Sequence, residues 1–235
     1  ALTSILPETK DADFTWKDYQ AKVNNELVAI LGNFVNRVSV LSNKYYDGKV
    51  PQGTILRNDT ETIAKVGKAL NNFNQRQGLE YYMEIARNGN KYLQDTEPWK
   101  LIKDETQKQA VADCIFTCIS IVKEIGKYGQ IFLPETSDKI LNLLNIHSYE
   151  EEINAGHQLG TPVLLFEKVE DEAIAKQMEK LASTPTIQAA VDDTSNAVLP
   201  PIKSEIVYDD FMKLDLRVGT ITAADNQVCW GTGSS

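Results

Sequence analysis

The chain has 235 residues, 42% hydrophobic and 24% charged, so it can bury a core and form one large domain, alone or with an additional fragment. No apolar run approaches the ~20 residues of a membrane span, and the first residues lack the basic start and apolar core of a signal peptide. The three cysteines are too few for a disulfide framework, which favours a reducing, cytoplasmic location.

The formal net charge of −9 is unfavourable for a nucleic-acid partner, because phosphate binding is normally accompanied by a basic surface. The charge is unevenly divided. Residues 1–110 carry 15 Lys+Arg against 14 Asp+Glu, whereas residues 111–235 carry 9 against 19. Any contact with RNA is therefore expected in the first half, made by a few placed residues rather than by a broad basic field.

Residues 1–15 are expected to be a loop or the end of a linker, and a long amphipathic helix is expected from Trp16 to about Tyr45. At about 100° per residue, the apolar side chains of this helix form one core-facing stripe. Its members are Val23, Leu27, Ile30, Leu31, Phe34, Val38, Leu41 and Tyr45. Asp47, Gly48 and Pro51 end the helix.

Further helical patterns follow at residues 60–75 and 78–94, as two helices or one interrupted helix, and then at 106–128, 133–144 and 171–182. The string Asp95-Thr96-Glu97-Pro98 is typical of a helix start, with a capping residue before a first-turn proline. Residues 154–166 are loop-like. The predicted fold is all-α, a bundle of five to six helices.

The composition also predicts a division of the chain. The helical domain is expected over residues 16–182, and the Ser-, Thr- and Pro-containing residues 183–205 are typical of a linker. Residues 206–227 contain a short amphipathic turn and then DLRVGTI, which alternates like a strand. Residues 228–235 have no periodicity and are interpreted as a cloning or translation scar.

Catalytic and metal chemistry are poorly supported. His147 and His157 have no cysteine or carboxylate at a convincing ligand spacing. Cys114 and Cys118, four residues apart on an apolar helix, are interpreted as small core residues rather than ligands or a redox pair. No phosphate-binding glycine loop is present.

The informative feature is the polar shoulder of the first helix, where Asn33 and Arg37 stand one turn apart on one face. An amide beside a guanidinium suits the edges of unpaired bases, and RNA loop bases also stack on aromatic side chains such as Trp99, which follows Pro98. The same features also fit a solvated surface pair and a tryptophan packed in the core. The residues alone leave both interpretations open.

Five strings, in order along residues 7–170, resemble methionyl-tRNA synthetases. They are PETKDADFTW (7–16), VNNELVAILGNFVNRVSVLSNKYYDGKVP (23–51), ARNGNKYLQDTEPWK (86–100), LPETSDKI (133–140) and GHQLGTPVLLF (156–166). The first resembles the junction that leaves the family's catalytic core, so residues 1–15 are expected to be that junction, and the other four resemble the anticodon-binding part. The resemblance implies recognition of the CAU anticodon of methionine tRNA. It places the family's Asn-x-x-x-Arg pair at Asn33 and Arg37, and its Pro-Trp at Pro98 and Trp99, which stacks on the first anticodon base. Some members have an asparagine where this chain has Ala29, which puts an auxiliary contact in doubt.

Residues 207–221, VYDDFMKLDLRVGTI, resemble the start of the OB-fold tRNA-binding module appended to many bacterial members. Such a barrel needs about five strands, and the chain offers one. In relatives this module supports dimerisation, so the resemblance implies a monomeric fragment and a parent enzyme that is a candidate homodimer.

The family's catalytic signatures, His-Ile-Gly-His-like and Lys-Met-Ser-Lys-Ser-like, are absent from the sequence, as is its zinc knuckle. The expected parent is a cytoplasmic ligase that uses ATP with magnesium. The chain itself is expected to hold no metal or cofactor, to lack catalysis, and to have methionine tRNA and the catalytic domain of the same protein as partners. The alternative is a helical protein-interaction or scaffold domain. An exposed Trp99 beside Arg37 favours RNA, whereas a buried Trp99 far from Arg37 favours the scaffold.

Overall fold

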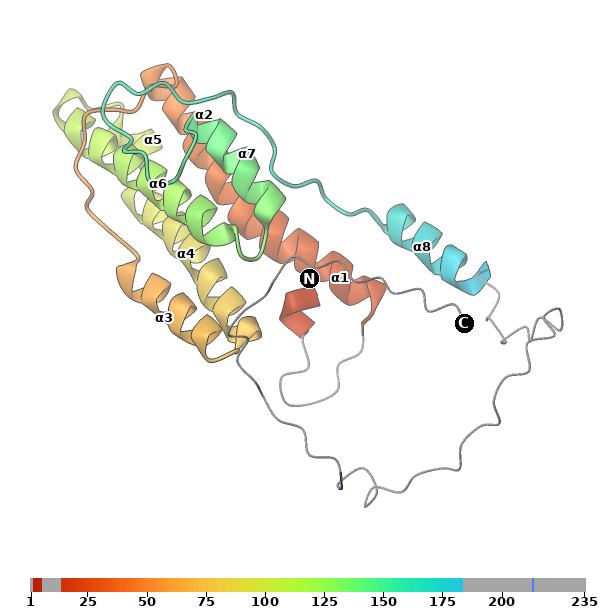
Figure 1. The fold of residues 1–235 in the computed structure, drawn as a ribbon. Coiled ribbons are helices and arrows are strands. Elements are labelled where there is room, and N and C mark those ends of the chain that lie inside the picture. Colours follow the sequence, from red (N-terminus) through yellow and green to blue (C-terminus); the bar gives the residue numbers. More distant parts are fainter. Residues whose placement is uncertain (1, 6–13, 184–212, 214–235) are drawn as a thin grey trace, which may run out of the picture. The chain divides into compact units, whose positions relative to one another are not determined.

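The computed structural model describes residues 2–5 and 14–183, together with Lys213 (Figure 1). Its elements are η1 (Leu2–Ile5), α1 (Trp16–Lys22), η2 (Val23–Gly32), α2 (Asn33–Tyr46), α3 (Thr60–Asn71), α4 (Gln75–Thr96), α5 (Pro98–Leu101), η3 (Glu105–Gln107), α6 (Lys108–Gly129), α7 (Pro134–Leu144) and α8 (Asp171–Ser183). The described part confirms the all-α fold class. The chain divides into two compact units, Ala1–Thr186 and Ile187–Ser235, and every named helix belongs to the first.

The predicted linker and the predicted OB-fold start lie outside the described residues, apart from Ser183 and Lys213, and so do residues 228–235. The predicted loop over residues 1–15 contains a short 3-10 helix, η1, which contacts α4. Within the described residues, no helix combines the length and the apolar character that crossing a bilayer requires.

The first long helix runs without a break from Trp16 to Tyr46, but its middle third, η2, is π-helical. The wider hydrogen bonding is visible at Asn33, whose backbone N–H reaches the carbonyl of Val28, five residues earlier. Thr15 caps the start of the helix, because its hydroxyl accepts from the Asp18 N–H at 3.0 Å. It ends where Asp47 and Gly48 take positive φ angles of 52° and 73°.

The predicted apolar stripe is confirmed in its centre, where Leu31, Phe34 and Val38 are buried. The buried face is wider than predicted, because Val35 and Ser42 are also fully buried. The buried Ser42 hydroxyl has a hydrogen-bond partner within the same helix, because it donates to the Val38 carbonyl at 2.8 Å. A stripe along one line is too narrow here because α2 is covered on more than one side, by α6, α4 and the segment after α7.

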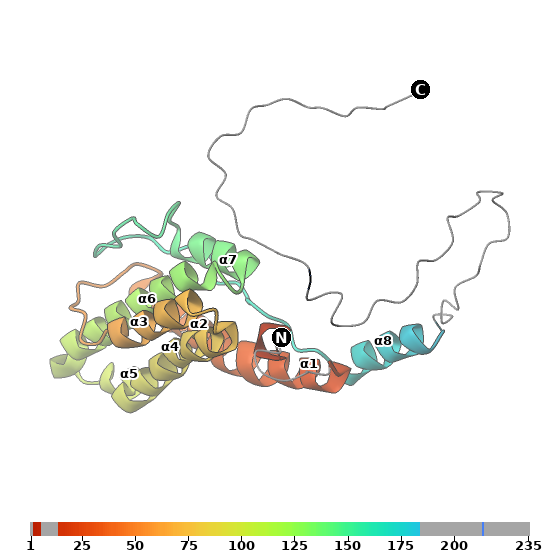
Figure 2. The same cartoon turned by 60° about the horizontal axis from the view of Figure 1, so that its bottom comes forward.

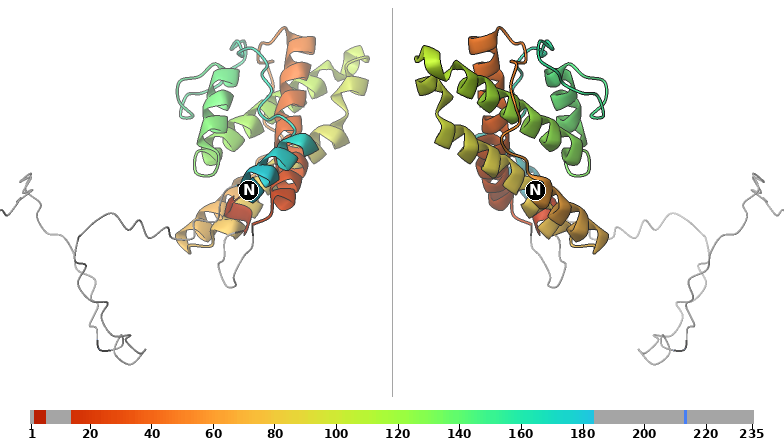
Figure 3. Two further views of the ribbon diagram at one scale, coloured as in Figure 1. Left: turned by 90° about the vertical axis from the view of Figure 1, so that its right-hand side faces the viewer. Right: turned by 90° about the vertical axis from the view of Figure 1, so that its left-hand side faces the viewer.

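Helices α3 and α4 form an antiparallel pair, which decides in favour of two helices over one interrupted helix (Figure 3). Their connection turns at Phe73, with φ 60°. Helix α6 contacts α2, α4, α5 and α7 and forms the centre of the bundle (Figure 1). Cys114 and Cys118 on α6 are fully buried, which confirms that they are core residues.

The segment after α7 returns along the bundle and pairs with the end of the first helix. Val50 N–H donates to the His157 carbonyl at 2.9 Å, and Leu159 N–H donates to the Gly48 carbonyl at 2.8 Å. The segment then leads to α8, which lies against α1 (Figure 2). Asn24 holds it there, because its side-chain amide donates to the Val169 carbonyl at 2.9 Å.

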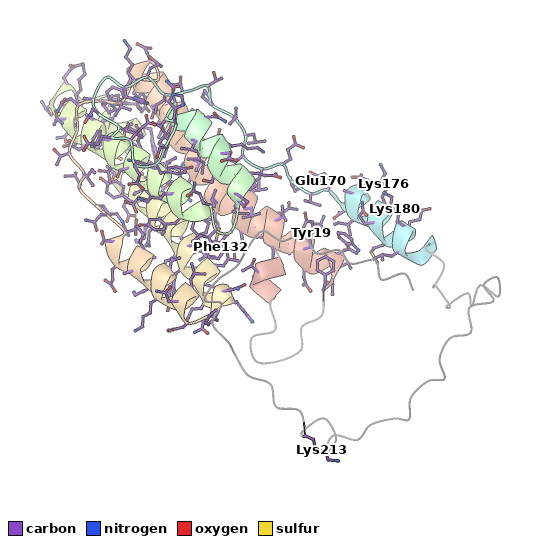
Figure 4. The ribbon with its side chains drawn as sticks, viewed as in Figure 1. Tyr19, Phe132, Glu170, Lys176, Lys180 and Lys213 are labelled. Carbon is purple, nitrogen blue, oxygen red and sulfur yellow. The ribbon has the colours of Figure 1, made fainter. Side chains whose placement is uncertain are left out.

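Side chains also pack where the elements meet at the lower end of the bundle. Phe132, in the turn between α6 and α7, lies with its ring centroid 5.4 Å from that of Tyr82 on α4 (Figure 4). The Tyr82 hydroxyl is buried and donates to the Ile125 carbonyl at 3.1 Å. This ring contact and this hydrogen bond join α4 to α6 and to the turn that follows it, and α4 also carries residues of the site described next.

Candidate nucleic-acid interface

Arg37 and Trp99, which the sequence could not place relative to each other, are neighbours in the structure. The guanidinium carbon of Arg37 on α2 lies 5.3 Å from the centroid of the Trp99 ring on α5, a cation–π arrangement. Arg37 Nη2 also donates to Gln94 Oε1 on α4 at 3.4 Å. Three helices thus meet at one guanidinium group.

A sharp change of direction brings Trp99 to this position. Helix α4 ends at Thr96, Glu97 takes a left-handed conformation with φ 47°, and α5 begins at once with the buried Pro98. The helix start is confirmed, but the predicted side-chain cap is wrong. The Thr96 hydroxyl instead donates to the Tyr92 carbonyl at 2.8 Å, in the last turn of α4, and no side chain caps the start of α5.

Trp99 combines the two environments that the sequence presented as alternatives. Its ring is half-buried and packs against the hydrophobic core. The ring nevertheless stays beside Arg37, which is itself only partly covered. Trp99 is therefore anchored by the core without being fully buried.

Asn33 is exposed at the first residue of α2, one turn before Arg37, as predicted. Both side chains border a shallow depression between the first helix and α4. The residues that line it are Ala29, Ile30, Asn33, Arg37, Arg87, Asn90, Lys91 and Gln94. None of them is acidic, although the chain as a whole carries nine more carboxylates than cations. The depression is therefore open to a negatively charged partner.

Asn90 is a residue of this depression that the sequence reasoning missed. Its side-chain amide donates to the Ile30 carbonyl at 2.9 Å and to the Ala86 carbonyl at 3.1 Å. Its side-chain oxygen is buried without a hydrogen-bond partner. Asn90 thereby ties α4 to the π-helical segment just before Asn33. The sequence does contain a signal for this role. The Asn90 amide lies beside the small residues Ala86 and Gly89, on a face of α4 that also carries the buried Leu93.

The nucleophilic and metal-binding side chains do not form a second site in the described part of the chain. The hydrogen bond with Cys114 and burial raise the pKa of the Cys118 thiol, which keeps it protonated. His157 uses Nε2 in a 2.7 Å hydrogen bond with the Leu144 carbonyl, and His147 stands exposed. No group of three or more His, Cys, Asp or Glu residues among those described is placed to hold a metal ion.

The family model described as "Anticodon binding domain of methionyl tRNA ligase" matches residues 48–186, and the model "tRNA synthetases class I (M)" matches residues 1–39. The methionine–tRNA ligase of Bacteroides fragilis is 45% identical over 94% of this chain. That of Christiangramia forsetii is 43% identical over 95% of it. The apo crystal structure of Mycobacterium tuberculosis methionyl-tRNA synthetase covers 72% of this chain and 38% of its own, at 22% identity and a TM-score of 0.62, and so shares its fold.

The chain spans only about a third of the length of these curated relatives, 34% for the B. fragilis enzyme and 35% for the C. forsetii enzyme. The match to the anticodon-binding model nevertheless covers more than half of the chain, and it includes α3 to α8. The chain therefore belongs to the methionyl-tRNA ligase family and carries that family's anticodon-binding domain.

Proposed function

We propose that this chain binds methionine tRNA and reads its CAU anticodon at the depression between the first helix and α4, together with Trp99 of α5 beside Arg37. The observation that carries this proposal is the position of Arg37 over Trp99, one turn from the exposed Asn33, at a surface lined by no carboxylate. Membership of the family supplies the general role in anticodon binding. The specificity for CAU rests on the resemblance of residues 33, 37, 98 and 99 to the family's motif.

Each side chain has a distinct role in the proposal. Trp99 offers its accessible ring for stacking of an unpaired base, and buried Pro98 fixes the backbone that holds it. Asn33 presents a donor and an acceptor to a base edge. The 3.4 Å hydrogen bond between Arg37 and Gln94 is long, so the guanidinium can turn from Gln94 to a base edge at little cost.

The same proposal places catalysis elsewhere in a longer parent protein. Activation of methionine with ATP and magnesium belongs to a catalytic domain, which is the second proposed partner of this chain. No chemical step is assigned to the described residues. The isolated chain is proposed to be a monomer that binds tRNA without charging it, from a cytoplasmic parent that is a candidate homodimer.

The test is titration of the chain with two fluorescent RNA stem-loops, one with CAU in the loop and one with a changed anticodon. Tighter binding of the CAU loop is expected. Trp99→Ala should weaken it by about 1–3 kcal/mol, the contribution of one stacked base, whereas Trp99→Phe should retain most of the affinity. Equal binding of both loops, or full affinity in Trp99→Ala, would favour the scaffold alternative.

Because Trp99 also packs on the core, a thermal unfolding curve must show that each variant is folded at the temperature of the binding assay. A Trp99→Ala protein that stays folded and loses CAU binding supports the proposal. Asn33→Ala provides a second variant at an exposed position, where folding is not at issue. Its expected effect is a loss of discrimination between the two loops.

A further inference from the structure

Two cations on α4 line the same depression as Arg37. Arg87 and Lys91 are four residues apart, so their side chains leave the helix on one face, about 6 Å apart along its axis. Together with Arg37 they are the only charged residues in the lining. The first helix thus contributes one pair spaced i,i+4, Asn33 and Arg37, and α4 contributes a second pair that is purely cationic.

Each α4 cation is held by a carboxylate outside the lining. Arg87 forms an ion pair with Glu26 on η2, and the Lys91 ammonium lies 3.2 Å from an oxygen of Asp95. The side chains remain 43% and 72% exposed, respectively. Ion pairs this exposed contribute little to stability, and a phosphate can take the place of the carboxylate because it accepts the same charge-assisted hydrogen bonds.

We propose that Arg87 and Lys91 bind backbone phosphates of the RNA, and that Glu26 and Asp95 occupy the places of those phosphates in the free protein. This inference rests on the proposed function and extends it from the bases to the backbone. Phosphate contacts set the register of a nucleic acid, whereas contacts with base edges carry the sequence information. The pair on α4 therefore positions the strand, and the pair on α2 reads it.

The test measures binding of the CAU stem-loop and the changed-anticodon stem-loop by the full chain at several salt concentrations. Arg87→Ala and Lys91→Ala should each weaken binding of both loops by about three- to fivefold near physiological salt. The ratio of the two affinities should not change. In the double variant, the slope of log affinity against log salt should flatten by about 1.4, since two counterions are no longer released from a single strand.

Variants of the paired carboxylates separate phosphate binding from a structural role. Glu26→Gln and Asp95→Asn should tighten binding of both loops, because they remove the groups that compete with phosphate. If the ion pairs only stabilised the fold, these variants would weaken binding as the alanine variants do. Lys65→Ala is the matched control, because Lys65 forms an i,i+4 pair with Glu61 on α3, outside the lining. It should leave affinity and slope unchanged.

The outcomes distinguish the two proposals. Unchanged affinity and slope in the double variant, with CAU still preferred, would overturn phosphate binding and leave anticodon reading intact. Equal affinity for both loops in the wild-type chain, with a lower salt slope in the double variant, would support phosphate binding and overturn CAU reading. A chain that binds neither loop would contradict both.

Discussion

The Arg37 guanidinium lies over the ring of Trp99, with 5.3 Å between its central carbon and the ring centroid. The two residues come from different helices, α2 and α5, and the left-handed Glu97 makes their meeting possible. A planar guanidinium can stack on a ring and donate two parallel hydrogen bonds to a base edge, whereas an ammonium is a point charge without this planar fork. The pairing therefore predicts that the shape of the Arg37 side chain matters as much as its charge.

Arg37→Lys should retain the charge and lose the planar fork. We expect discrimination between the CAU and changed-anticodon stem-loops to fall about tenfold or more, equivalent to one bidentate contact of ~1–3 kcal/mol. The salt slope of binding should stay within error of the wild type, because the cation is still present. Stem-loop titrations at two salt concentrations give both quantities. A variant that kept full discrimination would show that Arg37 acts only as a charge.

Asn90 is predicted to hold the π-helical segment in place through the Ile30 carbonyl. Asn90→Leu removes this hydrogen bond from the Ile30 carbonyl, which still accepts from the Asn33 backbone N–H, so the free energy of unfolding should fall by about 0.5–1.5 kcal/mol. Asn90→Asp should cost more at pH 7, because a buried carboxylate cannot donate to a carbonyl. Urea unfolding monitored by circular dichroism measures both. Wild-type stability in Asn90→Leu would contradict this role.

Two helix glycines are predicted to respond in opposite directions to the same substitution. A methyl group at Gly89 would stand 2.6 Å from the fully buried Phe34 ring, whereas one at Gly67 has nothing within 4 Å. Gly89→Ala should therefore destabilise by about 1–3 kcal/mol through overpacking. Gly67→Ala should stabilise by about 1 kcal/mol through helix propensity. Thermal unfolding of the two variants tests this, and shifts of the same sign would contradict it.

Glu124 is predicted to make stability depend on pH. Burial and the nearby Asp59 carboxylate raise its pKa, so the folded state keeps the proton at pH values where the unfolded chain releases it. This contribution is complete below the ordinary glutamate pKa of about 4.3 and is lost as the pH rises through the higher folded value. Glu124→Gln should thus match the wild type near pH 4 and unfold at a higher temperature than the wild type at pH 7.

Glu150→Gln is the control of opposite sign. The hydrogen bond from Lys127 lowers the pKa of Glu150, so its contribution is present at neutral pH and disappears as the pH falls through the lowered value. That variant should be slightly less stable than the wild type at pH 7 and equal to it in acid. If the difference in unfolding midpoint between Glu124→Gln and the wild type were the same at every pH, that result would contradict the burial argument.

Local patterns predicted the helices closely. The predicted helix at residues 106–128 is Lys108–Gly129, and the one at 171–182 is Asp171–Ser183. Caps, prolines and apolar periodicity act over a few residues, so they are visible in the sequence. The π-helical hydrogen bonding of η2 was not visible in the residue spacing, and neither was the hydrogen bond from Asn90 to the Ile30 carbonyl, sixty residues away. Val35, in the regular helix α2, was left out of the predicted stripe because α2 is covered on more than one side, by α6, α4 and the segment after α7.

The sequence by itself determined the fold class, the helix order, the buried cysteines and the common face of Asn33 and Arg37. All of these follow from spacing within one helix or from composition. Only the tertiary structure brought Trp99 beneath Arg37, placed Arg87 and Lys91 in the same lining as Arg37, and kept the carboxylates of the described residues out of that lining. The physical reason is that these relationships depend on how α2, α4 and α5 pack around α6, and no pattern within a single helix encodes the orientation of its neighbours.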